Sequence, residues 1–393
     1  MKRLPILAAT VCLLALVPAI VHAASAADEM VDIRTVVTVR IGHVGPMRGP
    51  IGHLGVDNER GARLAVEELN LRGLTIGGQR AQFELLTEND DADPQAAVAA
   101  AKRLVKAQVV GVIGHLNSST TIPASHIYAQ AGIPHITPSA TNPTYTRAGT
   151  ATAFRLIASD VEQGRALGRY VAKVLKARRV AIVDDGSAYG ATVADLFAAT
   201  VRGYGVTAIA RLYVDLTRPN FEPIVKQIKR QEPDLVFYGG MDAEAVLLLA
   251  EMRKRGLRQR LVGPDGIQTA MVSARPEAEG TIATQPGSIL SQKPGIEVFG
   301  KAYKNRFKDD IQIYAPEPYD AVMLMAEAMS KAHSIRPKEY LPYLKASDHQ
   351  GVSGRIRFDS TGDLIDAPVT FYRVEDGAWK YIATCAEDCV SAK

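Results

Sequence analysis

The chain has 393 residues, of which 47% are hydrophobic and 22% are charged. This composition is typical of a globular protein and excludes a disordered chain, a collagen-like repeat and a helical membrane bundle. At about 100–200 residues per domain, the length predicts two domains. The 46 basic and 42 acidic residues nearly balance and form no long basic run, so we expect no nucleic-acid partner.

Residues 1–26 have the pattern of a secretory signal peptide. Lys2 and Arg3 form a short positive segment, residues 4–21 are almost wholly apolar, and small residues follow. The alternative is a membrane anchor, because the apolar run approaches the roughly 20 residues that a span needs. Two prolines within the run and the small residues after it favour cleavage, so we expect an exported protein.

Cys385 and Cys389 are the two cysteines of the expected mature chain, and both lie in a short tail, residues 385–393. Their spacing allows a local disulfide in an oxidising compartment. Free or intermolecular thiols are the alternative. Neither arrangement would hold the fold together.

Strands and helices alternate through the first part of the chain. Strands are expected at residues 37–44, 82–86, 109–114 and 134–137, with helices at 59–70, from 94 through 105, and through 127 and 131. The same rhythm restarts later. Strands are expected at residues 179–184, 208–214, 235–238 and 260–262, with helices at 191–201, 221–230 and 243–255.

This strict alternation predicts right-handed crossovers and parallel sheets covered on both faces, and hence two similar α/β lobes. After a helix at residues 318–333, the segments 355–358, 368–374 and 379–381 are expected to add antiparallel strands. The fold class is therefore α/β, with two Rossmann-like lobes around parallel central sheets. No residue-level internal repeat is found.

Ligands of open parallel sheets bind beyond the carboxyl ends of the strands, so the loops there are candidate sites. Hydroxyl side chains after the strand at 109–114, with Pro123 in the first helical turn, indicate a helix N-terminus that suits an anion. The alternative to ligand binding is that Ser118 and Ser119 only cap the helix. The next strand ends in a second hydroxyl-bearing loop, residues 138–143, and together the two loops suggest a cradle for a small carboxylate.

The second lobe places Tyr189 just before a helix and Asp265 at a strand end. A carboxylate facing the anion cradle across a cleft would suit an ammonium group. Each residue alone also fits a cap or a turn.

An enzyme is the rival class of function. The chain has no Gly-x-Gly-x-x-Gly after its first strand, no phosphate-binding Gly-x-x-x-x-Gly-Lys-Ser/Thr and no His-Glu-x-x-His. Residues 186–190 do not form a nucleophile elbow. The acids Glu88, Asp90, Asp91 and Asp93 are interpreted as a solvated loop and helix cap. We expect no catalysis, cofactor or metal.

Two segments resemble a known family. Gly-His-Leu-Asn-Ser-Ser-Thr-Thr-Ile-Pro at 114–123 and Gly-Ile-Pro-His-Ile-Thr-Pro-Ser-Ala-Thr-Asn-Pro at 132–143 are similar to the signature of branched-chain amino-acid-binding proteins of bacterial ABC transporters. Motifs at 45–50, 238–240 and 262–266 follow in the expected order, so the resemblance covers roughly residues 36–375.

The resemblance implies a class I periplasmic binding fold whose lobes are joined by three chain crossings. One lobe would comprise residues 36–157 and 288–365, and the other 158–287 and 366–384. It further implies that Ser118, Thr141 and the backbone near Ser139 and Ala140 hold the ligand carboxylate and ammonium. Asp265 would meet the ammonium where the family commonly has Glu, and Tyr189 would close over the ligand.

Some residues depart from the family pattern. Leu54 and Met241 stand where leucine-type members tend to carry aromatic residues, and Tyr314 replaces a typical Phe near the side-chain pocket. Core packing is the alternative for Leu54 and Met241. Ala92 and Asn117 occupy positions of an early disulfide that is missing here.

The implied function is reversible capture of an L-amino acid, branched-chain or aliphatic, in the periplasm. The partners would be that ligand and a membrane permease with its ATPase subunits, and we expect a monomer. The alternative is a ligand-sensing receptor module for an amino acid, amide or aromatic acid.

Overall fold

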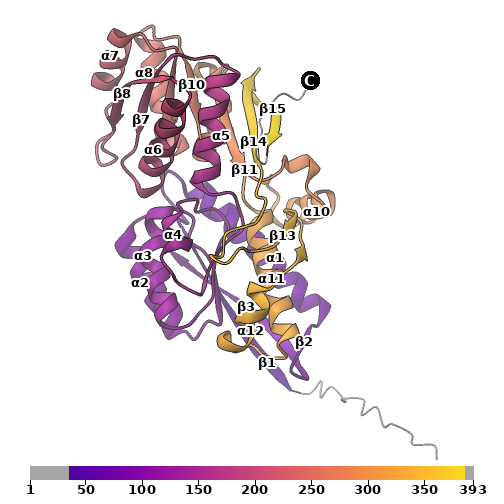
Figure 1. The fold of residues 1–393 in the computed structure, drawn as a ribbon. Coiled ribbons are helices and arrows are strands. Elements are labelled where there is room, and N and C mark those ends of the chain that lie inside the picture. Colours follow the sequence, from indigo (N-terminus) through magenta and orange to yellow (C-terminus); the bar gives the residue numbers. More distant parts are fainter. Residues whose placement is uncertain (1–34, 386–393) are drawn as a thin grey trace, which may run out of the picture.

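The computed structural model describes residues 35–385, which form two lobes that each surround a sheet of their own (Figure 1). The expected signal peptide, residues 1–26, and the tail beyond 385 lie outside the described residues. Cys385 is disulfide-bonded, so the free-thiol interpretation of this residue is wrong.

The first sheet has six strands in the order β2-β3-β1-β4-β5-β6. Its strands are β1 (Val36–Gly45), β2 (Thr75–Ile76), β3 (Gln79–Asn89), β4 (Gly111–Gly114), β5 (His135–Thr137) and β6 (Ala153–Arg155). All neighbours are parallel except β2 and β3. The helices between them are α1 (Gly52–Arg72), α2 (Pro94–Lys106), α3 (Ser118–Gln130) and α4 (Thr144–Arg147).

The second sheet has seven strands in the order β15-β14-β11-β10-β9-β7-β8. The parallel part is β7 (Arg179–Asp184), β8 (Thr207–Tyr213), β9 (Leu235–Gly239), β10 (Arg260–Gly263) and β11 (Ile282–Pro286). Its principal helices are α5 (Asp160–Lys173), α6 (Ala188–Gly203), α7 (Glu222–Gln231) and α8 (Asp242–Lys254), with the short α9 (Ala270–Ser273). Three-residue turns of 3-10 helix lie at η1 (Asp265–Ile267), η2 (Pro276–Ala278) and η3 (Leu290–Gln292).

The last part of the chain returns to both lobes. The helices α10 (Ile296–Phe307), α11 (Pro316–Lys331) and α12 (Pro337–Lys345) contribute buried side chains to the core of the first lobe. β12 (His349–Gln350) and β13 (Arg355–Ile356) form a small antiparallel pair. β14 (Val369–Glu375) and β15 (Ala378–Cys385) then add antiparallel strands to β11, which confirms the antiparallel additions expected there. The chain thus passes between the two large sheets three times.

Several helix ends follow from local chemistry. Asp93 caps α2, because its carboxylate accepts hydrogen bonds from the backbone N–H groups of Gln95 and Ala96. Ser159 and Glu162 form a capping box at the start of α5. α1 ends at Gly73, whose φ of 69° is a left-handed conformation that glycine adopts without strain.

The helix α1 begins at Gly52, seven residues before the predicted start at 59. Gly55 lies so close to the carbonyl of Pro46 that a Cβ atom there would stand 2.0 Å from the oxygen. This first turn therefore packs backbone against backbone, and it lacks the apolar periodicity by which a buried helix is recognised. α3 likewise begins early, so Pro123 lies in its second turn rather than its first.

Buried apolar side chains cover both faces of each large sheet. Clusters around Ile41, Val322 and Met325 and around Val112 and Leu104 cover the first sheet. Two further clusters cover the second sheet.

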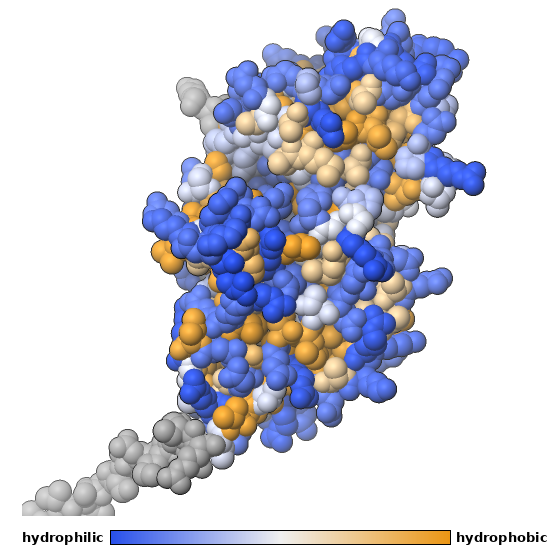
Figure 2. Space-filling view, turned by 180° about the vertical axis from the view of Figure 1, so that it is seen from behind, coloured by the Kyte–Doolittle hydropathy of each residue, from blue (hydrophilic) through white to orange (hydrophobic). Residues whose placement is uncertain are grey.

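From behind, the surface is mostly hydrophilic, with apolar side chains in separate patches (Figure 2). None of the helices within residues 35–385 combines the length and apolar character needed to cross a membrane.

Candidate ligand-binding site

The strand-end loops of the two lobes meet around a small cavity of about 20 Å³. This volume has room for about one water molecule. The lining includes every site residue predicted from the sequence except Leu54. It consists of Leu116, Asn117, Ser118, Ser139, Ala140, Thr141, Tyr189, Met241, Asp265, Gly266 and Tyr314.

Ser118 is the first residue of α3, and its side chain does not cap the helix. Its hydroxyl oxygen instead accepts a hydrogen bond from the backbone N–H of Asn142, 3.2 Å away in the second loop. Ser119 bridges to the other lobe, because its hydroxyl oxygen lies 3.3 Å from the backbone N of Ala188. The capping interpretation of the two serines is therefore wrong, and the hydroxyls connect loops.

The second loop presents one free hydroxyl. Ser139 donates to the carbonyl of Leu116 at 3.2 Å and accepts from the side-chain amide of Asn58 at 3.1 Å. The backbone N–H of Ala140 is already bonded to the hydroxyl of Thr137 at 2.9 Å. In contrast, the buried hydroxyl of Thr141 faces the side chain of Asp160, and the two form no hydrogen bond of good geometry. A buried hydroxyl without a partner is costly, so Thr141 is the group of this loop that a ligand would satisfy most directly.

Arg155 at the end of β6 holds this loop in place. Its fully buried guanidinium donates to the carbonyls of Ala140 and Asn142 at 3.1 and 2.9 Å. The same group forms an ion pair with Asp363 at 2.6 Å. The backbone of the second loop is thereby fixed by a residue that the sequence analysis did not single out.

Asp265 is buried on the opposite side of the cavity and accepts hydrogen bonds from three side chains. Gln163 and Tyr189 donate to Oδ1, each at 2.8 Å, and Tyr314 donates to Oδ2. Burial raises the pKa of Asp265, although these donors oppose the shift. Burial also raises the pKa of Tyr189 and Tyr314, which keeps both hydroxyls protonated as donors.

Tyr314 comes from the first lobe and is held by Asp57 of α1. The carboxylate of Asp57 accepts hydrogen bonds from the backbone N–H groups of residues 312–315 and from the hydroxyl of Tyr303. Asp57 lies in the second turn of α1, some 255 residues before its backbone partners, so no local pattern could have revealed its role.

Leu54 and Met241 occupy different places. Leu54 is fully buried behind the cavity, where it packs with Leu116 and Tyr314, as in the core-packing alternative. Met241 lines the cavity at the start of α8. It also packs against that same cluster.

Asp160 is a buried acid near the site that sequence reasoning missed. It is the first residue of α5, it is fully buried, and neither carboxylate oxygen has a hydrogen-bond partner. Burial raises its pKa well above the usual value. The nearby hydroxyl of Thr141 opposes this shift, and the charge of Asp265 adds to it. The raised pKa of Asp160 favours its neutral, protonated form, so Asp265, which is held by neutral donors, is the acid that favours a cationic group in the ligand.

The acidic segment at 88–93 is only partly solvated. Asp93 caps α2, as predicted. Asp90 is fully buried and accepts a hydrogen bond from Nδ1 of His115 at 2.8 Å, so the solvated interpretation of this residue is wrong. It anchors the start of the loop that carries Ser118. Among the described residues no cluster of His, Cys, Asp or Glu is arranged to hold a metal ion.

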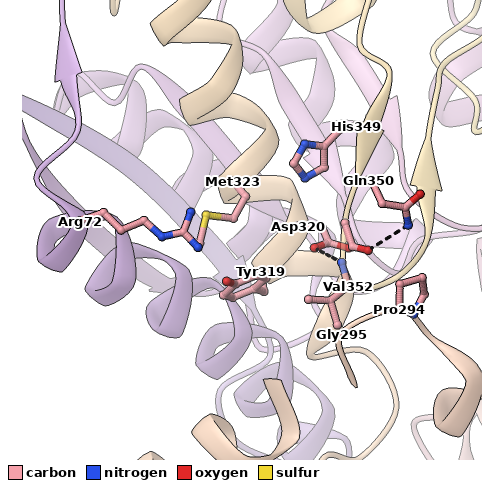
Figure 3. A pocket seen from close by; sticks show the side chains of 10 residues that line it. Arg72, Pro294, Gly295, Tyr319, Asp320, Met323, His349, Gln350 and Val352 are labelled. Atoms are coloured by element: carbon pink, nitrogen blue, oxygen red, sulfur yellow. Dashed lines mark hydrogen bonds between the residues drawn. The ribbon is translucent and has the colours of Figure 1, made fainter. Parts of the chain in front are cut away.

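A larger pocket of about 340 Å³ lies in the first lobe, between α11, β12 and the segment before α10 (Figure 3). Its polar side chains already have partners. Arg72 pairs with Glu68, and Asp320 accepts from the backbone N–H groups of Val352 and Ser353. The smaller cavity between the lobes, with its unpartnered hydroxyl and buried acids, is the better candidate for a ligand.

Comparisons with known proteins show the family of this chain. A family model described as a periplasmic binding protein matches residues 38–378. The leucine-, isoleucine-, valine-, threonine- and alanine-binding protein of Pseudomonas aeruginosa is 32% identical over 337 residues, covering 85% of this chain and 89% of that protein. The leucine-specific-binding protein of Salmonella typhimurium is 32% identical over 328 residues, covering 83% of this chain and 88% of that protein.

A solved structure has the same architecture. The branched-chain amino acid transporter substrate-binding protein LivJ of Streptococcus pneumoniae, in complex with isoleucine, superposes with a TM-score of 0.79 at 25% identity. The match covers 88% of this chain and 99% of that one.

Proposed function

Because this chain belongs to the periplasmic binding protein family, we propose that it captures an L-amino acid between its two lobes and delivers it to the permease of an ABC transporter. The observation that carries the proposal is the pairing of two groups across the cavity. The unpartnered hydroxyl of Thr141 lies on one lobe, and the buried carboxylate of Asp265 lies on the other. An amino acid has a carboxylate and an ammonium group that could satisfy both sides at once.

In this arrangement the α-carboxylate of the ligand binds the loops at Ser118 and 139–141. The hydroxyl of Thr141 donates to this carboxylate, and the ammonium group binds Asp265. Leu116, Met241 and Tyr314 contact the ligand side chain, and an apolar side chain of the branched-chain class suits the first two. The cavity of about 20 Å³ means that Met241 or the lobes must shift to admit it.

Capture requires the lobes to move. We place the hinge at the three crossings, with residues 36–157 and 288–365 in one lobe and 158–287 and 366–384 in the other. A ligand that contacts both lobes binds the closed state better than the open state, so it drives closure. The closed, monomeric protein then presents its ligand to the permease, without any chemical change to the ligand.

The relatives also support the proposed location. Periplasmic binding proteins work outside the cytoplasmic membrane, and cleavage within residues 1–26 would release this chain there. Mass spectrometry of the secreted protein would test this directly, since the mature N-terminus should begin near residue 27.

The test of the proposed function is the melting temperature of refolded protein with single L-amino acids, because refolding removes ligand carried from the cell. A ligand present at about 100 times its Kd adds about 2.7 kcal/mol of stability. We expect an upward shift with leucine, isoleucine or valine. No shift with any L-amino acid would contradict the proposal.

A further inference from the structure

A histidine and an aspartate meet across the cleft outside the ligand cavity. His53 lies in the first turn of α1 and Asp242 begins α8, so the two residues belong to different lobes. Nε2 of His53 is 3.0 Å from Oδ2 of Asp242. Neither residue lines the cavity.

The two partners differ in how they are held. The side chain of Asp242 is fully buried, and it also accepts hydrogen bonds from the hydroxyl of Thr269 at 2.8 Å and the backbone N–H of Ala243 at 2.9 Å. The side chain of His53 is 30% exposed. Asp242 is therefore fixed within its own lobe, and separation of the lobes would take His53 away from it into water.

We propose that His53 and Asp242 form a latch between the lobes, which makes closure, and therefore ligand affinity, stronger when His53 is protonated. The proposal rests on the proposed function, because it adds a control on the closure that captures the ligand. His53 is a positioning residue that acts on the ligand only through the closed state.

The groups around the pair favour a protonated imidazole. Hydrogen bonding to Asp242 is the largest cause that raises the pKa of His53, while its partial burial opposes the shift. The backbone of Pro50 and the charge of Asp57 raise it further. The other titratable groups that face Asp242 are Glu244 of α8 and two protonated tyrosines, Tyr238 and Tyr314. No cation among the described residues takes the place of His53 beside Asp242.

The direction of the pH effect follows from linkage. In the open state His53 is solvated and has the ordinary histidine pKa of about 6.5. In the closed state its pKa is raised, so protonated His53 favours closure. This contribution is fully present below pH about 6.5 and is lost as the pH rises through the raised value.

Other contacts between the lobes do not produce the effect expected of the latch. The contact of Tyr314 with Asp265 contains an acid whose pKa is raised by burial, and protonating this acid at low pH would weaken the binding of an ammonium group, which is opposite in direction to the latch.

The contacts made by Asn142 contain no titratable group. Asn142 donates to the carbonyl of Ala188 at 2.6 Å and to the hydroxyl of Thr192 at 2.9 Å. Burial lowers the pKa of His43 to about 4, and it also lowers that of His135. These two histidines stay neutral between pH 5.5 and 8, so the latch is separable from them.

The experiment is a calorimetric titration of refolded protein with L-leucine at pH 5.5 and pH 8.0. The ligand keeps the same charge across this range, because its carboxyl and ammonium groups titrate outside it. We expect the Kd of the wild type to be about two- to fivefold lower at pH 5.5, the effect of a partly exposed ion pair. His53→Gln retains a hydrogen-bonding side chain that does not ionise, so its Kd should lack the decrease at pH 5.5.

Two further variants sharpen the result. His126→Gln makes the same substitution on the exposed face of α3 and should keep the pH dependence of the wild type. Asp242→Asn should abolish that dependence, and adding His53→Gln to it should change nothing more. A pH-independent Kd in the wild type, or an unchanged pH dependence in His53→Gln, would overturn the latch while leaving amino-acid capture intact.

A second measurement does not need a ligand. Spin labels at Leu71→Cys and Arg230→Cys, exposed positions at the ends of α1 and α7, report the distance between the lobes. Without ligand, we expect a larger closed population at pH 5.5 than at pH 8.0 in the wild type and equal populations in His53→Gln. Equal populations in both proteins would contradict the latch even if no amino acid bound.

Discussion

Asp265 accepts hydrogen bonds from Gln163, Tyr189 and Tyr314. A carboxylate offers about four acceptor positions, so about one remains for an ammonium group. The burial of this acid is thus offset by neutral donors, and within residues 35–385 no Lys, Arg or His forms an ion pair with it. A ligand ammonium would supply that missing positive charge.

We predict that Tyr314→Phe lowers stability and enlarges the response to ligand. The variant removes one donor to a buried charge, which should cost about 1.5–3 kcal/mol. A bound ammonium can take the vacated position on Oδ2, so the rise in melting temperature on adding L-leucine should exceed that of the wild type. Tyr145→Phe is the matched control, because its buried hydroxyl bonds to the carbonyl of His135 away from the cavity. An equal ligand response in all three proteins would show that the ammonium does not reach Oδ2.

Asp160 illustrates the opposite situation, a buried acid that faces the hydroxyl of Thr141 without a hydrogen bond of good geometry. Because its folded-state pKa is raised, the folded protein holds a proton that the unfolded chain releases more easily. Stability is therefore lost as the pH rises above the unfolded pKa of about 3.9.

Asp160→Asn, which cannot ionise, should consequently be more stable than the wild type at pH 7. We expect a rise in melting temperature of about 2 °C or more, which vanishes as the pH falls below about 4. Asp309→Asn is the control and should lower the melting temperature at pH 7, because hydrogen bonding to Arg60 lowers the pKa of Asp309 and its ionised form therefore stabilises the fold. If the variant is no more stable than the wild type at neutral pH, burial of the Asp160 carboxyl group does not lower the stability of the folded protein.

At the scale of the elements, the site consists of loops that share the carboxyl ends of parallel strands. β4 and β5 are neighbours in the first sheet, so the loops with Ser118 and Thr141 lie side by side. β10 places Asp265 at the corresponding edge of the second sheet. The bracing of these loops by Arg155 and Asp363 connects the site to the third chain crossing.

Arg155→Met should therefore weaken both stability and binding. Loss of one partner leaves Asp363 without its buried counterion and frees two loop carbonyls, which should cost about 3–5 kcal/mol in urea denaturation. Arg40→Met is the control, because it removes an ordinary surface ion pair. The Arg40 and Glu84 side chains are about half exposed, so their pair should contribute less than about 1 kcal/mol to the free energy of unfolding. Similar losses in the two variants would mean that Arg155 does not brace the loop.

The sequence allowed the alternating elements and the loops of the site to be predicted because both signals are local. Apolar runs such as 109–114 mark buried strands, and hydroxyl-rich loops follow them directly. The start of α1 escaped because Gly52 and Gly55 pack by backbone contact. The supports of the site, Asp57, Arg155 and Gln163, escaped because their partners lie far along the chain. Buried polar residues carry no periodic signal that separates them from solvated ones, as Asp90 demonstrates.

At the scale of the whole molecule, two sheets are connected by three crossings, and the ligand would stand between them. Because the elements of the cavity come from both lobes, binding and closure are one equilibrium. A ligand shifts this equilibrium only by the difference between its affinities for the two states. Residues away from the ligand, such as His53, can therefore tune affinity by acting on closure alone.

The most direct test of capture at this cavity is calorimetric titration of refolded protein with L-leucine, in the wild type and in the double variant Thr141→Ala, Asp265→Ala. We expect saturable binding of one ligand per chain in the wild type. In the double variant, the loss of one partner for the carboxylate and one for the ammonium group should weaken binding by about a hundredfold or more. A double variant that bound L-leucine as tightly as the wild type would contradict capture at this cavity.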